Sequence, residues 1–163
     1  MNDDGSASRA RHSALRLLAR REHSQYELRR KLKARGYGER LVDELLAELI
    51  TERLLSDTRY AEAMVTNRAS RGYGPLRICM ELRDRGVAEG IVDKVLQEAE
   101  VDWEERLRHT YDRKYGGIAV ESFKTWASRA QFLKNRGFSV DAIRRVIGNY
   151  GASTPNARRA TKE

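Results

Sequence analysis

A repeat of about fifty residues constrains the fold of this 163-residue chain more than any other feature. Gly36, Gly86 and Gly137 are separated by 50 and 51 residues, and each ends a basic segment: KLKARG, ELRDRG and FLKNRG. Apolar residues follow each glycine by 6, 9 and 10 positions. These offsets are typical of one buried face of a helix. The period therefore predicts three copies of one small helical unit.

Each copy is expected to contain three helices, and no segment shows the alternation of a strand. The expected helices cover residues 8–21, 25–34, 39–53, 58–71, 75–84, 89–99, 103–114, 122–135 and 140–149. The predicted fold class is all-α: three tandem three-helix repeats that form an elongated or curved array. The repeats are placed at residues 8–55, 56–101 and 102–150. The tail, residues 151–163, lacks an apolar face and is predicted to be disordered.

Several residues have the character of helix caps. Ser24, with Glu27 three positions later, forms a capping-box pattern at the start of a middle helix. Thr125 occupies the equivalent place in the third copy, and Asp57 and Asp102 are predicted to cap the helices that open the second and third copies. The repeated glycines are predicted to end the middle helices in a left-handed conformation.

The segment Gly72-Tyr73-Gly74-Pro75 could be a phosphate-binding loop or the start of a helix. A phosphate loop needs a preceding strand and a longer glycine pattern, and neither is present. Gly74 aligns with Ser24, and Pro75 falls at the first helical position, which proline favours. The segment is therefore interpreted as a helix start.

The net charge of +8 indicates an anionic partner, either nucleic acid or an acidic protein surface. The charge also alternates along the chain. Residues 9–40, 66–85 and 106–136 have net charges of +8, +3 and +6, and residues 41–65 and 89–105 have −4 and −6. This pattern could form repeated basic ridges that bind a polymer, or simply a solvated surface of mixed sign.

Sequence signals for catalysis are absent. Cys79 is the single cysteine, and His12, His23 and His109 are scattered without a metal-ligand spacing. No nucleophile motif, signal-peptide core or membrane-spanning stretch is found. We therefore expect a cytoplasmic protein that is not an enzyme and uses no metal or cofactor.

The middle copy resembles the signature of the RecX family of bacterial regulatory proteins. The matching residues are Asp57, Arg59, Tyr60, Ala61, Arg68, Gly72, Gly74, Arg77, Ile78, Glu81, Leu82 and Gly86. The flanking copies resemble the family's three tandem units, so the resemblance covers residues 9–150. The third copy departs most, with Arg129 and Ala130 where Ile78 and Cys79 stand in the second.

The resemblance implies a regulator of the RecA recombinase, active in recombination, DNA repair and the SOS response. Family members are thought to lie in the groove of the RecA–DNA filament and to inhibit its ATP hydrolysis and strand exchange. The implied partners are the RecA filament and single- or double-stranded DNA, reached directly or through the filament. No membrane is expected, and the protein should be a monomer.

The candidate partner-binding residues come from the basic segments and are Arg29, Arg30, Lys33, Arg68, Arg71, Tyr73, Arg77, Arg83 and Arg85. Two other interpretations stay open. The chain could be a helical repeat protein that binds nucleic acid without RecA, or a scaffold for another acidic partner.

Overall fold

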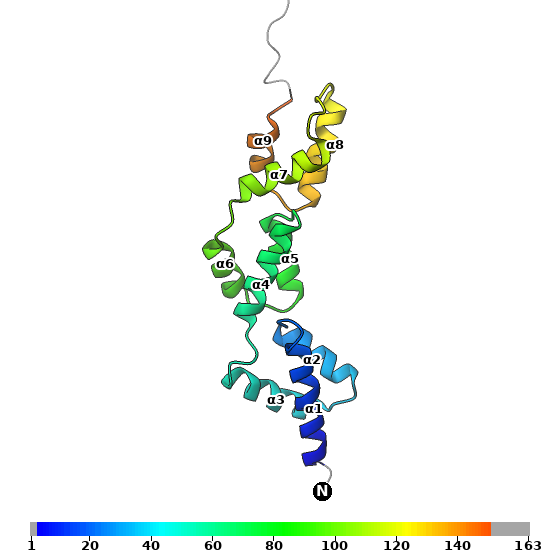
Figure 1. Cartoon of the computed structure of the whole chain (residues 1–163), viewed down its shortest axis with the longest axis vertical. Coiled ribbons are helices and arrows are strands. Elements are labelled where there is room, and N and C mark those ends of the chain that lie inside the picture. The colour runs from blue at the N-terminus through cyan, green and yellow to red at the C-terminus, as the bar shows by residue number, and fades with distance from the viewer. Residues whose placement is uncertain (1–2, 151–163) are drawn as a thin grey trace, which may run out of the picture. The chain divides into compact units, whose positions relative to one another are not determined.

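The computed structural model describes residues 3–150, and every regular element within them is a helix (Figure 1). The helices are α1 (Asp3–Leu18), α2 (Gln25–Ala34), α3 (Glu39–Thr51), α4 (Asp57–Ser70), α5 (Pro75–Asp84), α6 (Glu89–Glu98), α7 (Trp103–Tyr115), α8 (Phe123–Asn135) and α9 (Val140–Ile147). The predicted all-α fold with three sets of three helices is confirmed. The tail predicted to be disordered, residues 151–163, lies outside the described residues.

Helix bounds agree closely with the prediction. Both α2 and α5 have the predicted bounds, whereas α1 begins at residue 3 rather than 8 and ends at 18 rather than 21. The chain divides into two compact units. The first holds residues up to 71 together with 78–100, and the second holds residues 72–77 together with 101 onward. Helix α5 therefore begins in the second unit and continues in the first.

The apolar faces predicted by the repeat form the cores. In the first repeat, Ala10 and Ala14 of α1 are fully buried with Leu28 of α2 and Val42 of α3. The small alanine side chains let the neighbouring helices approach α1 closely. In the third repeat, a separate core contains Leu107, Leu133, Phe138 and Ile143.

The repeated leucines and glycines take equivalent places. Leu32, Leu82 and Leu133 are each 0% exposed, so the register of the three copies is confirmed. Gly36, Gly86 and Gly137 have φ values of 87°, 71° and 92°. These are left-handed conformations just after a helix, as predicted.

Two of the predicted caps are wrong and two are confirmed. Ser24 and Asp102 accept backbone N–H groups of α2 and α7. Helix α4 is capped by Ser56 rather than by Asp57, because the Asp57 carboxylate instead accepts the Gln25 N–H of α2 at 2.8 Å.

Helix α8 is capped by Ser122 rather than by Thr125, whose N–H donates to the Ser122 hydroxyl at 3.1 Å. Helix α8 has 13 residues, whereas α2 and α5 have 10 each. The middle helix of the third copy therefore begins within one residue of its predicted start at 122, ahead of the cap position that the repeat assigned to Thr125.

The third repeat differs from the others by a buried cation. Arg129 takes the place of Ile78 but is only 4% exposed. Its guanidinium donates to the Tyr111 hydroxyl at 2.7 Å and to the carbonyls of Ile118 and Ala119 at 2.9 and 3.1 Å. Neutral oxygens thus accept the hydrogen bonds of the buried guanidinium. Through the two carbonyls, Arg129 holds the loop between α7 and α8 in place.

Candidate partner-binding surfaces

The start of a middle helix contacts the turn that ends the next middle helix at two places along the chain. We call the contact of residues 23–27 with residues 85–87 the first junction, and that of residues 73–77 with residues 136–138 the second junction. The first lies within the first compact unit and the second within the second unit. Both use equivalent positions of the repeat.

The first junction begins at the N-terminus of α2. The Ser24 hydroxyl accepts the Glu27 N–H at 3.1 Å and donates to the Arg85 carbonyl at 2.8 Å. A Cβ atom on Gly86 would lie 2.7 Å from the Cβ of Tyr26. Gly86 is therefore needed both for its positive φ and for the close approach of α2.

A buried carboxylate holds the first junction together. The Glu27 side chain is 3% exposed and pairs with Arg21 at 2.9 Å and with Arg85. Burial alone would raise the pKa of Glu27, but the hydrogen bond from Arg21 and the charges of Arg21 and Arg85 hold it below its ordinary value. Arg85 also lies 3.4 Å from the Tyr60 hydroxyl. Glu27 thus pairs with two arginines instead of completing the predicted capping box.

His23 borders the Glu27 cluster as a neutral ring. Burial first, and then the charges of Arg21 and Lys31, lower the pKa of His23 below its ordinary value. A neutral ring fits both contacts: Nδ1 donates to the Arg21 carbonyl at 3.0 Å, and Nε2 accepts from the Lys31 ammonium at 2.9 Å.

The second junction relies on backbone contacts. The Gly74 N–H donates to the Arg136 carbonyl at 2.8 Å, and the Leu76 N–H donates to the Gly137 carbonyl at 3.1 Å. A Cβ atom on Gly74 would lie 2.4 Å from the Gly137 oxygen, and one on Gly137 would lie 2.3 Å from the Arg77 Cβ. The segment Gly72–Pro75 is therefore both a helix start, as predicted, and the docking point for the next repeat.

Cations stack on aromatic rings around the second junction. The Arg136 guanidinium lies 4.8 Å from the centre of the Tyr73 ring and 5.3 Å from that of Phe132. Arg77 lies 5.7 Å from the same Tyr73 ring, and Lys114 lies 3.7 Å from Phe132. These contacts fix the directions in which the cations point without neutralising them.

The candidate residues do not form one continuous ridge. Arg68 pairs with Glu81 at 2.7 Å in a half-buried contact, and Arg85 belongs to the Glu27 cluster. Other predicted cations form exposed ion pairs, namely Arg29 with Asp43, Lys33 with Glu39 and Arg83 with Glu89. Arg30 is exposed on α2, and Tyr73 and Arg77 belong to the second junction.

Three of the candidates do meet at one place. Arg68, Arg71 and Arg85 line a cavity of about 410 Å³ together with Tyr60 and Arg21. Sequence reasoning did not include Arg21 among the candidates, since its role depends on a contact between α2 and the end of α5 that no local pattern reveals. The ion pairs of Arg68 and Arg85 give this cavity a mainly structural role.

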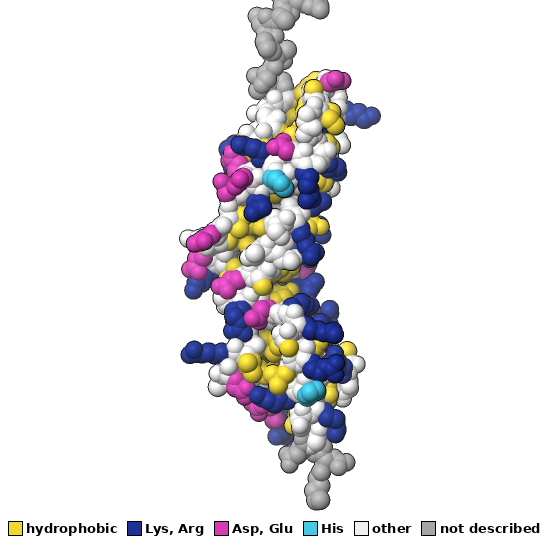
Figure 2. Space-filling view, in the orientation of Figure 1, with side chains coloured by type: hydrophobic (Ala, Val, Ile, Leu, Met, Phe, Trp, Pro, Cys, Tyr) yellow, Lys and Arg dark blue, Asp and Glu magenta, His cyan; other side chains and the backbone are white. Residues whose placement is uncertain are grey.

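The alternating charge of the sequence is partly explained by ion pairs inside the first repeat. Figure 2 shows cationic side chains over α1 and α2 and carboxylates over α3. Arg11 of α1 pairs with Glu52, the C-cap of α3, at 2.7 Å, and Arg29 of α2 pairs with Asp43 of α3 at 2.8 Å. Such exposed pairs contribute little to the stability of a fold, because water and salt screen them.

A search of residues 3–150 finds no group of three His, Cys, Asp or Glu side chains that could hold a metal ion. Over the same residues, none of the helices is long and apolar enough to cross a membrane.

Family models match each of the three helical repeats. The first, second and third three-helix domains of RecX match residues 10–49, 56–96 and 100–147. A curated relative from Halorhodospira halophila, named Regulatory protein RecX, is 46% identical over 145 residues, which is 88% of this chain and 90% of the relative. A protein of the same name from Ectopseudomonas mendocina is 46% identical over 137 residues, covering 84% of this chain and 91% of the relative.

Solved structures show the same fold. The crystal structure of RecX from Lactobacillus salivarius superposes with a TM-score of 0.72 at 22% identity, over 88% of this chain and 96% of that one. A second structure, titled as regulatory protein RecX, gives a TM-score of 0.71 at 21% identity, over 88% of this chain and 72% of that one. The three domain matches and the close relatives together establish that this chain belongs to the RecX family of regulatory proteins.

Proposed function

We propose that this protein binds the RecA–DNA filament and lowers its ATP hydrolysis and strand exchange. The observation that best supports this role is the match of all three helical repeats to RecX domains. The relatives are named as regulatory proteins, which supports a regulator that acts without catalysis of its own. Action in the cytoplasm as a monomer is part of the same proposal.

The contact with the filament is assigned to the exposed basic residues at and near the second junction. Arg77 is exposed, lies beside Tyr73, and matches the family signature. A guanidinium in this place suits carboxylates or phosphates of a partner. Binding through several repeats would gain from multivalency, because the second contact forms at a high effective concentration.

The proposal is tested by the DNA-dependent ATPase activity of RecA, measured while this protein is titrated in. The rate should fall with increasing protein, whereas the protein alone should hydrolyse no ATP. Lys94→Glu, an exposed change on acidic α6, is a suitable control because it alters charge away from the proposed contact. Robust hydrolysis by a recombinase-free sample would indicate an enzyme instead.

The alternative function is direct nucleic-acid binding without RecA. A groove on the first repeat that is lined by Arg9, Arg16, Arg20 and Arg35 is the observation that favours it. Comparing affinity for naked DNA with affinity for the filament at physiological salt separates the two roles. Equal affinities would favour the alternative.

A further inference from the structure

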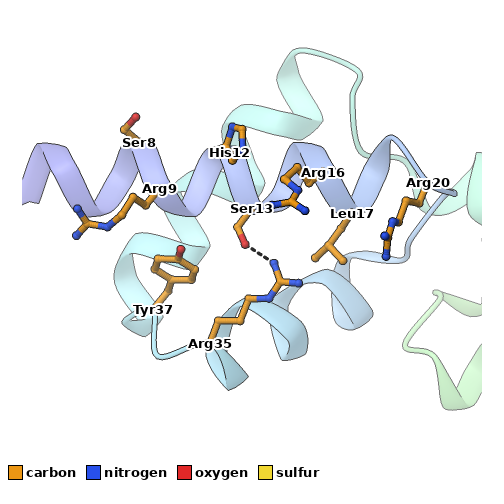
Figure 3. Close-up of a pocket in the computed structure, with 9 residues that line it drawn as sticks. All are labelled: Ser8, Arg9, His12, Ser13, Arg16, Leu17, Arg20, Arg35 and Tyr37. Carbon is orange, nitrogen blue, oxygen red and sulfur yellow. Dashed lines mark hydrogen bonds between the residues drawn. The ribbon is translucent and has the colours of Figure 1, made fainter.

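A groove between α1 and the end of α2 gathers positive charge in the first repeat (Figure 3). It has a volume of about 630 Å³. We call it the cationic groove, and its lining residues are Ser8, Arg9, His12, Ser13, Arg16, Leu17, Arg20, Arg35 and Tyr37. Arg35 belongs to the repeated segment KLKARG, and none of the nine is among the predicted partner-binding residues.

The spacing of its residues places the groove along one face of α1. Arg9, Ser13 and Arg16 follow one another at offsets of 4 and 3, which is the spacing of a single helix face, and Arg20 lies four residues further on in the turn after α1. Arg9 and Arg16 are two turns apart, which corresponds to roughly 10 Å along the helix axis. The cations therefore form a row rather than a point, and a row suits a polymer with repeated negative charge.

The row is not neutralised within the described part of the chain. The lining contains no carboxylate, and over residues 3–150 neither Arg9, Arg16 nor Arg20 forms an ion pair. Arg35 donates to the Ser13 hydroxyl, a neutral acceptor that leaves its charge in place. On a different face of the same helix, Arg11 pairs with Glu52 and Glu48 at 2.7 and 3.8 Å. Helix α1 thus has one face whose cation is paired with α3 and one whose cations are not.

We propose that the cationic groove binds the phosphate backbone of single-stranded nucleic acid. Four arginines line it, and the planar guanidinium binds phosphate oxygens in pairs. Tyr37, half-buried at one end beside Arg9, offers a ring on which a base can stack. An acidic peptide segment offers the same negative charge but carries no base that could stack on the Tyr37 ring.

This inference goes beyond the proposed function, because the groove would bind a bare strand without the recombinase. Its failure is therefore distinguishable from failure of the regulator proposal: one is measured on an oligonucleotide alone and the other on the ATPase activity of the filament. The two tests probe different residues, because the groove belongs to the first compact unit and the second junction belongs to the second.

The test is fluorescence anisotropy of a labelled oligothymidylate of about 16 nucleotides, titrated with the full chain at salt concentrations of about 50 to 200 mM. Arg16→Gln should weaken binding and lower the slope of log affinity against log salt by about 0.7, the value for one lost phosphate contact on a single strand. Arg11→Gln is the matched control, because it removes the same charge from another face of the same helix. It should leave both affinity and slope unchanged.

The double change Arg16→Glu with Arg20→Glu should weaken binding by about tenfold or more. Circular dichroism and a melting curve confirm that each variant folds like the parent. Parental affinity in the folded double variant overturns the proposal. Poly-glutamate that displaces the oligonucleotide at matched charge would also overturn it, in favour of an acidic protein segment. Equal affinity for a duplex of the same length would overturn the assignment to a single strand.

Discussion

The two junctions place the same backbone positions together but hold them by different chemistry. Ser24 and Gly74 are equivalent, as are Arg85 and Arg136, and each pair brings a helix start to the next turn. Three residues after the first of these positions stands Glu27 in one junction and Arg77 in the other. The first junction therefore contains a buried carboxylate between two arginines, whereas the second contains cations stacked on aromatic rings.

The difference shows that equivalent positions of the repeat can either stabilise the fold or present charge to a partner. Because Glu27 uses its charge within the fold, the first junction is suited to stabilising the chain. Because Arg77 is exposed and held by an aromatic ring, the second is suited to meeting an anionic partner.

Arg85→Glu should break the first junction. It places a second carboxylate beside buried Glu27, so the free energy of unfolding should fall by about 3 kcal/mol, as when a buried ion pair is broken. Urea denaturation measures this loss. Arg83→Glu, two residues earlier in the last turn of α5, is the control, because Arg83 forms an exposed pair with Glu89 and the change should stay within about 1 kcal/mol. Similar losses of unfolding free energy in both variants would show that the Glu27 cluster stabilises the fold no more than an exposed ion pair does.

Gly74→Ala should break the second junction by steric overlap. The new methyl group would lie 2.4 Å from the Gly137 backbone oxygen, which cannot move as a flexible side chain can. The free energy of unfolding should fall by about 1–3 kcal/mol. Gly38→Ala is the matched control, since no atom lies within 4 Å of its added Cβ and its φ is −65°. An unchanged urea midpoint for Gly74→Ala would mean that the second junction is open in solution.

Acid should weaken the first junction before the second. The pKa of His23 is lowered from 6.5 in the folded state, so its contribution is present above about pH 6.5 and is lost as the pH falls below that value. The pKa of Glu27 is also lowered, from 4.5, so further stability is lost below about pH 4.5. The second junction is joined by backbone hydrogen bonds of Gly74 and Leu76, which involve no titratable group.

Amide hydrogen exchange between pH 7 and pH 5 measures this difference. Protection should decrease at the start of α2 and remain at the start of α5. His23→Gln is the control, because the pH dependence between 7 and 5 should become flatter without the imidazole. A protection factor at the start of α2 that is the same at pH 7 and pH 5, after correction for the intrinsic exchange rate, would contradict the assignment of a neutral His23.

Arg77→Glu should have the smallest effect on stability and a clear effect on function. The side chain is exposed, so the urea midpoint should change by the equivalent of about 0.5 kcal/mol or less. If the proposed function is right, inhibition of the RecA ATPase by the variant should be weaker than by the parent, most clearly at low salt. Inhibition by the parent should itself weaken as salt rises, because charged contacts are screened. Full inhibition by Arg77→Glu across a salt series would show that Arg77 does not contact the filament.

Much of the fold could be predicted because its signals are local. The glycine period located the ends of the middle helices, and apolar offsets identified Leu32, Leu82 and Leu133 as core residues. The two wrong caps arise where local signals compete. Ser56 and Asp57 can both cap a helix, and the choice depends on Gln25, which lies 32 residues away.

The candidate site was harder to predict because its ion pairs join distant segments. Arg68 and Arg85 looked like free basic residues in the sequence, yet Glu81 and Glu27 neutralise them in the fold. Arg129 could be recognised as a departure from the repeat, but its neutral partners lie on the loop between α7 and α8. Charge counts alone do not distinguish a paired cation from an unpaired one.

The first junction also has a consequence for synthesis of the chain. The Ser24 hydroxyl and the Arg85 carbonyl are 61 residues apart, so this contact cannot form while only the first repeat has left the ribosome. At that stage Glu27 has Arg21 but lacks Arg85. Translation adds about 5 to 20 residues per second, so the first repeat waits several seconds for this partner. The nascent first repeat should therefore be less resistant to proteases than the same residues in the finished protein.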